Sequence, residues 1–267
     1  DMKILTMILQ FVGSLSFLLF GMKLMSDGVQ KSAGKSLHRI LGLMTSNRFF
    51  GMLTGMFVTM IIQSSGATTV MVVSFVNAGL MTLAQAIGVI FGANIGTTIT
   101  AWIVALFGFK FDIAVLAIPL FGIGYLLKSV KTINKPNVGE AVMGFGLLFL
   151  GLDLLKNVMS FDAAQVSFLT SFNDKGVLGL IIGLFAGGII TALLHSSSAS
   201  TAIILTMSHQ GLLSWEFAAA MVLGSNIGST VDAIMASWGT KTNAKRAALV
   251  HVMFNVIGTV IAMFFLK

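Results

Sequence analysis

The chain has 267 residues, of which 56% are hydrophobic and 9% are charged, and its mean hydropathy is +0.97. Soluble domains carry about 25% charged residues, so this composition excludes a soluble globular protein and predicts an all-α, multi-pass protein of the plasma membrane or cell inner membrane. The formal net charge of +7 does not indicate a nucleic-acid partner, because most cationic residues fall in loops between apolar runs, where they set orientation in the membrane. The absence of cysteine excludes disulfides and cysteine-based metal sites.

The chain begins with a predicted span and a predicted surface helix. Residues 4–25 form an apolar run that is long enough, at about 1.5 Å per residue, to cross about 30 Å of hydrocarbon. Lys23 lies near the end of this run, where its amine can reach water. Residues 26–48 combine cationic and apolar side chains at a spacing typical of an amphipathic helix on the membrane surface.

Polar breaks interrupt the next two apolar segments. Residues 49–79 contain Gln-Ser-Ser-Gly at 63–66, which leaves two alternatives, one long kinked helix or a re-entrant helical hairpin. The break favours the hairpin, because glycine permits a turn and serine caps the outgoing helix. Residues 83–107 have glycines on both sides of Asn94, which indicate a spanning helix that is unwound in the middle. Residues 111–127 form the third predicted span.

Two motifs of the first half return in the second half at a common shift of 132 residues. His-Ser-Ser-Ser-Ala-Ser-Thr at 195–201 matches Gln-Ser-Ser-Gly-Ala-Thr-Thr at 63–69. Gly-Ser-Asn-Ile-Gly-Ser-Thr at 224–230 matches Gly-Ala-Asn-Ile-Gly-Thr-Thr at 92–98. Two motifs duplicated at one offset indicate an internal duplication of the whole unit.

The duplication predicts two repeats, at residues 1–137 and 138–267. Each repeat has three spanning helices, one of them unwound, and one re-entrant hairpin that returns to its own side. Because three is odd, the second repeat enters the membrane from the opposite face, so the repeats are predicted to be inverted. The elements of the second repeat are expected to be spans at 138–156 and 247–266, a hairpin at 176–211 and an unwound span at 215–238.

Four broken elements at related positions predict a polar cavity between the repeats. Irregular backbone persists in a membrane only where it is buried or lines a wet cavity, and inverted repeats with broken helices are typical of secondary transporters. At each hairpin tip the outgoing helix directs free amides and partial positive charge into the cavity, and hydroxyl groups add donors, which suits an oxyanion. The expected anion-binding residues are Ser64, Ser65, Gly66, Thr68, Ser196, Ser197, Ser198 and Ser200.

A coupling cation is expected beside the anion. Neither serine-rich motif contains arginine or lysine, so dipoles, hydroxyl groups and a co-bound cation must hold the anion. Sodium takes oxygen ligands, and its charge offsets that of the anion, which couples the binding of the two ions. No organic cofactor is expected. The expected sodium ligands are Gln63, Thr69, Asn94, Thr97, His195, Thr201, Asn226, Ser229 and Asp232.

The four spaced motifs resemble those of the type II sodium–phosphate cotransporter family, in which a duplicated Gln-Ser-Ser-Ser motif marks two re-entrant hairpins. The resemblance covers residues 49–102 and 177–238, and it implies sodium-driven uptake of inorganic phosphate, with both ions held between the hairpins. Some bacterial members carry a soluble regulatory domain after the membrane part, so we expect either a trimmed or a minimal chain that lacks such a domain after residue 267.

Three positions depart from the family motif or from the internal repeat. Gly66 replaces the third serine of the first motif, and His195 replaces the glutamine of the second motif. Asp232 stands where the first repeat has Thr100, which adds a carboxylate near the second break. The expected site is therefore only pseudo-symmetric.

The sequence also leaves alternatives to phosphate transport. The same scaffold could carry another small oxyanion or a carboxylate, or it could bind phosphate as a sensor without transport. The serine clusters could instead serve close helix packing. An enzyme is not expected, because adjacent His195 and Ser196 do not by themselves supply hydrolase geometry. The expected partners are phosphate, sodium, membrane lipid and a second copy of the chain in a homodimer.

Overall fold

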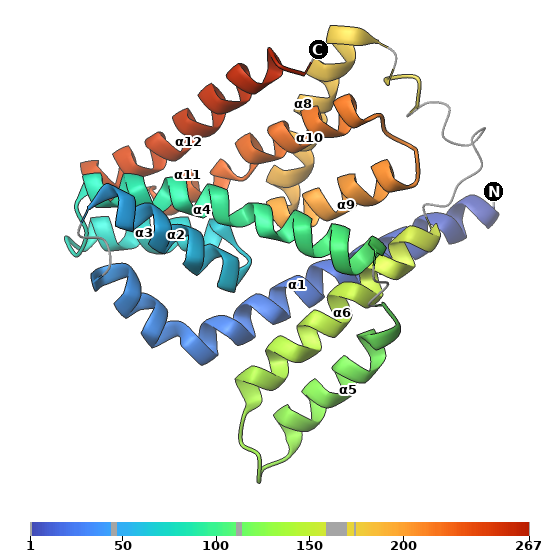
Figure 1. Ribbon diagram of the computed structural model, residues 1–267, viewed down its shortest axis with the longest axis horizontal. Coiled ribbons are helices and arrows are strands. Elements are labelled where there is room, and N and C mark those ends of the chain that lie inside the picture. Colours follow the sequence, from blue (N-terminus) through green and yellow to red (C-terminus); the bar gives the residue numbers. More distant parts are fainter. Residues whose placement is uncertain (1, 44–46, 111–113, 159–169, 174, 267) are drawn as a thin grey trace.

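The computed structural model describes residues 2–43, 47–110, 114–158, 170–173 and 175–266, and all regular secondary structure in these ranges is helical (Figure 1). Within these ranges, six segments are long and apolar enough to cross a membrane, which confirms a multi-pass membrane protein. These segments are Leu5–Leu41, Leu83–Lys110, Pro136–Val158, Gly176–Leu194, Trp215–Ala236 and Thr242–Met263.

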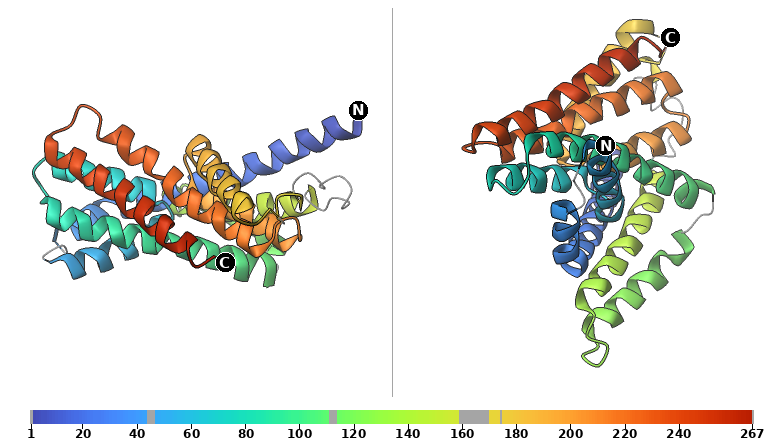
Figure 2. Two further views of the ribbon diagram at one scale, coloured as in Figure 1. Left: turned by 90° about the horizontal axis from the view of Figure 1, so that it is seen from above. Right: turned by 60° about the vertical axis from the view of Figure 1, so that its left-hand side comes forward.

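Helix α1, Met2–Leu43, is one continuous helix of 42 residues that changes direction along its length (Figure 1). The prediction of a separate helix at 26–48 is therefore wrong, because residues 26–43 continue the first helix without a break. This part of α1 packs on α6, Pro136–Val158, and a Cβ on Gly28 would lie 2.7 Å from the Asn137 carbonyl oxygen. The N-terminal part of α1 extends beyond the other helices (Figure 2).

The unwound middle predicted for residues 83–107 is wrong. Helix α4, Leu83–Ile103, is continuous through the glycine motif, and a π-helix at Val104–Lys110 extends it. The glycines instead permit close packing on α2, Arg48–Ile62, since a Cβ on Gly96 would lie 2.5 Å from the Met56 carbonyl oxygen. A Cβ on Gly92 would lie still closer to the Met52 carbonyl oxygen. Small residues at such positions let two membrane helices approach each other.

The broken span predicted at 215–238 does contain a break, which lies near the end of the glycine motif and not at Asn226. Helix α10 ends at Gly228 (Trp215–Gly228), and α11, Thr230–Ala236, begins two residues later. Within the motif, Gly224 packs against the backbone of α8, Gly176–Leu194, as Gly92 does against α2. The break therefore lies at Ser229, and Asn226 is inside a regular helix.

The remaining helices complete the two halves. Helix α5, Ala114–Ser129, has 16 residues, fewer than the about 20 of a full crossing, and residues 111–113 of the span predicted there lie outside the described ranges. Helices α5 and α6 pack together and project as a pair from the other helices (Figures 1 and 2). Helix α12, Thr242–Met263, packs on α3, α4, α10 and α11.

The apolar side chains form buried clusters between helices and exposed bands on the outside. One buried cluster joins Leu18 of α1 and Phe149 of α6 to Ala202 of α9, Ser197–His209. Large apolar side chains such as Phe185 and Leu193 of α8 remain exposed. An exterior of this kind suits contact with lipid.

Candidate functional site

The first predicted hairpin contains a sharp break between two helices. Helix α2 ends at Ile62, Gln63 adopts the left-handed conformation with φ of 60°, and α3, Ser65–Asn77, begins after it. Ser64 caps α3, because its Oγ accepts a hydrogen bond from the Ala67 amide at 3.1 Å. Across the break, the Thr59 hydroxyl of α2 donates a hydrogen bond to the Thr68 hydroxyl of α3 at 2.9 Å, which joins the two helices beside it.

The second predicted hairpin has the same local geometry 132 residues later. His195 follows α8 and adopts the left-handed conformation with φ of 50°. Ser196 caps α9, Ser197–His209, and its Oγ accepts a hydrogen bond from the Ala199 amide at 3.2 Å. A left-handed conformation is uncommon and costly for residues other than glycine, so its presence at both equivalent positions extends the sequence duplication to the backbone.

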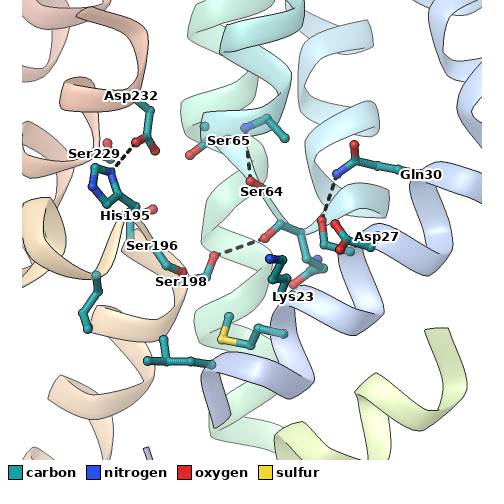
Figure 3. Close-up of a pocket in the computed structure, with 18 residues that line it drawn as sticks. Lys23, Asp27, Gln30, Ser64, Ser65, His195, Ser196, Ser198, Ser229 and Asp232 are labelled. Atoms are coloured by element: carbon teal, nitrogen blue, oxygen red, sulfur yellow. Dashed lines mark hydrogen bonds and ion pairs between the residues drawn. The ribbon is translucent and has the colours of Figure 1, made fainter. Parts of the chain in front are cut away.

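Both breaks line one cavity of about 410 Å³ (Figure 3). The outgoing helices α3 and α9 begin at its wall, and the capping serines hold the Ala67 and Ala199 amides. The first residues of each helix, Ser65 and Gly66 in α3 and Ser197 and Ser198 in α9, line the cavity and lie beyond those caps. The predicted residues that line this cavity are Gln63, Ser64, Ser65, Gly66, His195, Ser196, Ser197, Ser198, Ser229 and Asp232.

Seven predicted residues do not line the cavity. The Asn94 side-chain amide donates to the Ile90 carbonyl oxygen at 3.1 Å, and the Thr97 hydroxyl donates to the Ala93 carbonyl oxygen at 3.0 Å, so both are engaged within α4. The hydroxyl groups of Thr69 and Ser200 are buried and have no hydrogen-bond partner among the described residues. The seven are Thr68, Thr69, Asn94, Thr97, Ser200, Thr201 and Asn226.

The three departures from the motif meet at one end of the cavity. His195 Nδ1 lies 2.7 Å from Asp232 Oδ1, and a Cβ built on Gly66 would lie 2.7 Å from Asp232 Oδ2 (Figure 3). A serine at position 66 would therefore crowd the carboxylate, whereas glycine leaves room for it. The substitutions at 66, 195 and 232 form one structural unit.

At the equivalent positions around Thr100 of the first repeat, the contacts are made by neutral groups. The Thr100 hydroxyl donates to Gln63 Oε1 at 3.0 Å, at the positions equivalent to Asp232 and His195. Ser198, the equivalent of Gly66, lies with its Oγ 3.3 Å from Thr100 Oγ1. Gly66 at the first break thus contacts Asp232 of α11, and Ser198 at the second break contacts Thr100 of α4. Of these two contacts, only the one at Asp232 involves an ionisable pair, His195 and Asp232.

Helix α1 supplies a wall of the cavity that the sequence reasoning missed. Its side chains lie three or four positions apart, which places them on one helical face. The prediction ended the first span at residue 25 and assigned Lys23 to the water boundary, so this face was divided between two elements. Its continuous polar stripe was the signal that could have found it. The α1 residues that line the cavity are Leu19, Met22, Lys23, Ser26, Asp27 and Gln30.

The cavity contains few fixed charges. Its lining includes one lysine, Lys23, and two aspartates, Asp27 and Asp232, so its formal charge is −1 when His195 is neutral. An anion entering alone would meet a net negative wall, and each cation that enters with it lowers this repulsion. The arrangement therefore favours joint binding of an oxyanion and cations over binding of the anion alone.

Known proteins match almost the whole chain. A model of the Na+/Pi-cotransporter family matches residues 17–157 and 161–267. The chain is 30% identical over 262 residues to "Uncharacterized protein YqeW" of Bacillus subtilis (strain 168), covering 97% of this chain and 82% of that protein. It is 27% identical over 259 residues to "Putative inorganic phosphate export protein YjbB" of Escherichia coli (strain K12), covering 95% of this chain and 46% of that protein.

A shorter match reaches animal transporters. "Sodium-dependent phosphate transport protein 2B" of Homo sapiens is 39% identical over 97 residues, which are 36% of this chain and 14% of that protein. No solved structure matches the chain. The chain thus spans most of the Bacillus relative but less than half of the Escherichia relative.

Proposed function

The chain belongs to the Na+/Pi-cotransporter family, and on this premise we propose that it moves inorganic phosphate together with sodium across the membrane. The observation that carries the proposal is the pair of helix breaks with equal backbone geometry that line one cavity. The family is one of transporters, and the site's hydroxyl groups and helix N-termini serve binding in this proposal.

Phosphate binds between the two breaks. The N-termini of α3 and α9 offer the backbone amides that precede the capped ones, and Ser65 and Ser197 add hydroxyl donors, while Ser198 lines the cavity. Such donors act on a phosphate oxygen without a full positive charge. The binding residues among the predicted set are therefore those that line the cavity, and Thr68 and Ser200 support the first turns of the outgoing helices.

Sodium binds beside phosphate and couples its movement to the sodium gradient. Asp232 supplies a carboxylate, and Gln63 and Ser229 supply neutral oxygen atoms at the cavity wall, which matches the oxygen ligands of a hard cation. The buried hydroxyl of Thr69 in α3, which has no hydrogen-bond partner among the described residues, offers a further oxygen close to the first break. No organic cofactor takes part.

Alternating access uses the two repeats as the moving parts. We propose that α2–α3 and α8–α9 are re-entrant hairpins, that the repeats at residues 1–137 and 138–267 are inverted, and that rocking between them opens the cavity to each side in turn. The contacts of Ser198 with Thr100 and of Gly66 with Asp232 join the two halves at the cavity, which supports this division. Phosphate then follows the sodium gradient, inward under an inward gradient.

Flux into liposomes that contain the purified protein tests this proposal. Labelled phosphate should accumulate when sodium is outside and should leave preloaded vesicles when sodium is reversed, and potassium should not replace sodium. Competition by arsenate, sulfate and succinate decides between phosphate and another small oxyanion or carboxylate. Flux that ignores sodium, or flux of another anion without phosphate, would refute the proposal.

A further inference from the structure

Lys23 is a cation at the cavity that neither serine-rich motif contains. It lies in the middle of α1, and its side chain is exposed and lines the cavity together with Ser64, Ser65 and Ser198. Figure 3 shows Lys23 on the α1 side of the cavity, with His195 and Asp232 on the other side. Its position is therefore one that a ligand between the two breaks can reach.

Lys31 of α1 and Lys128 of α5 already share one acidic partner, Glu140. Lys31 Nζ lies 2.7 Å from Glu140 Oε2, and Lys128 Nζ lies 2.9 Å from Glu140 Oε1. In contrast, the described residues give Lys23 no hydrogen bond or ion pair, although Asp27 lies one turn away on the same face. The ammonium group of Lys23 thus keeps its donors for a ligand in the cavity.

We propose that Lys23 is an anion-binding residue and supplies the fixed positive charge that holds phosphate between the two helix breaks. The inference rests on the proposed function and adds a residue from outside the duplicated motifs. Lysine binds phosphate as a point charge through up to three N–H donors. Lys23 also balances one of the two aspartates in the cavity wall, which lowers the repulsion that a phosphate dianion meets.

A single introduced thiol tests this role, because the chain contains no cysteine. We would measure binding of radiolabelled inorganic phosphate to purified full-chain K23C at saturating sodium. The variant should bind phosphate roughly tenfold more weakly than the unsubstituted protein, as expected for loss of a charge-assisted hydrogen bond. Treatment with 2-aminoethyl methanethiosulfonate, which restores an ammonium group, should recover most of the affinity, whereas the neutral 2-hydroxyethyl reagent should not.

The matched control is K35C, on the same helix, exposed and outside the cavity lining. Neither K35C nor its two modified forms should change phosphate binding. Unchanged binding by K23C, or equal recovery with the neutral reagent, would overturn the inference. Should K23C fold poorly, K23Q must show the same loss, and normal binding by K23Q would equally overturn it. Absence of sodium-dependent phosphate binding by the unsubstituted protein would instead refute the proposed function.

Discussion

Gly66 in the first turn of α3 lies against the carboxylate of Asp232 in α11, so close that a Cβ on Gly66 would be 2.7 Å from Asp232 Oδ2. The carboxylate cannot turn away freely, because His195 Nδ1 holds its other oxygen at 2.7 Å. Residue 66 therefore sets how much room the second repeat has for an acidic side chain.

The first prediction concerns this pair. G66S should destabilise the protein by about 1–3 kcal/mol, the usual cost of overpacking, and should slow transport. D232T copies Thr100 and should relieve the crowding, so G66S/D232T should regain most of the lost stability. Thermal unfolding of both single variants and the double variant measures their coupling. Additive losses would show that the two positions do not act together.

The second prediction concerns the glycines of α4 and α10. G92A and G224A should each destabilise the protein by about 1–3 kcal/mol, because the added methyl groups would meet the carbonyl oxygens of Met52 and Leu184. Gly258 in α12 is the matched control, since a Cβ there meets nothing within 4 Å. G258A should leave the unfolding temperature unchanged or raise it slightly. Tolerance of G92A and G224A would restore the unwound-helix interpretation.

A third prediction separates capping from ligand binding at the first break. S64A should cost about 1 kcal/mol of stability through loss of the cap to Ala67, and it should also weaken phosphate binding. S65A removes a cavity hydroxyl without touching that cap, so it should abolish transport while the unfolding temperature stays within the error. Thermal unfolding and phosphate flux, measured on the same preparations, distinguish loss of the cap from loss of a binding hydroxyl. Full transport by S65A would remove Ser65 from the site.

A fourth prediction concerns the acidic group of the cavity. D232N keeps the shape of the side chain but removes its charge, so the sodium concentration for half-maximal phosphate uptake should rise about tenfold, equal to about 1.4 kcal/mol. E216Q removes a carboxylate that lies outside this cavity and should leave the sodium dependence unchanged. Sodium titrations of uptake test both variants. An unaltered titration for D232N would exclude Asp232 as a sodium ligand.

The sequence predicted both helix breaks because they depend on local chemistry. A left-handed residue followed by a capping serine is a short-range feature, and its duplication distinguished it from ordinary serine-rich packing. The prediction for α4 was wrong because glycine occurs both where a helix unwinds and where a neighbouring helix packs closely. Only the position of α2 shows that Gly92 and Gly96 serve the second use.

The α1 wall of the cavity depends on tertiary structure. Lys23 and Asp27 share a helical face that sequence periodicity can reveal, but no local signal says that this face meets the two hairpin breaks. In the same way, the contact of Gly66 with Asp232 joins residues 166 positions apart. The inversion of the repeats stays a prediction.

The central claim is that both helix breaks hold one phosphate, in the company of sodium. Equilibrium binding of labelled phosphate to the purified protein tests it most directly, in sodium and in potassium, for the unsubstituted chain, S65A and S197A. The account predicts one phosphate per chain, bound in sodium only, and lost in either variant. Binding that ignores sodium, or two phosphates of which each variant removes one, would contradict it.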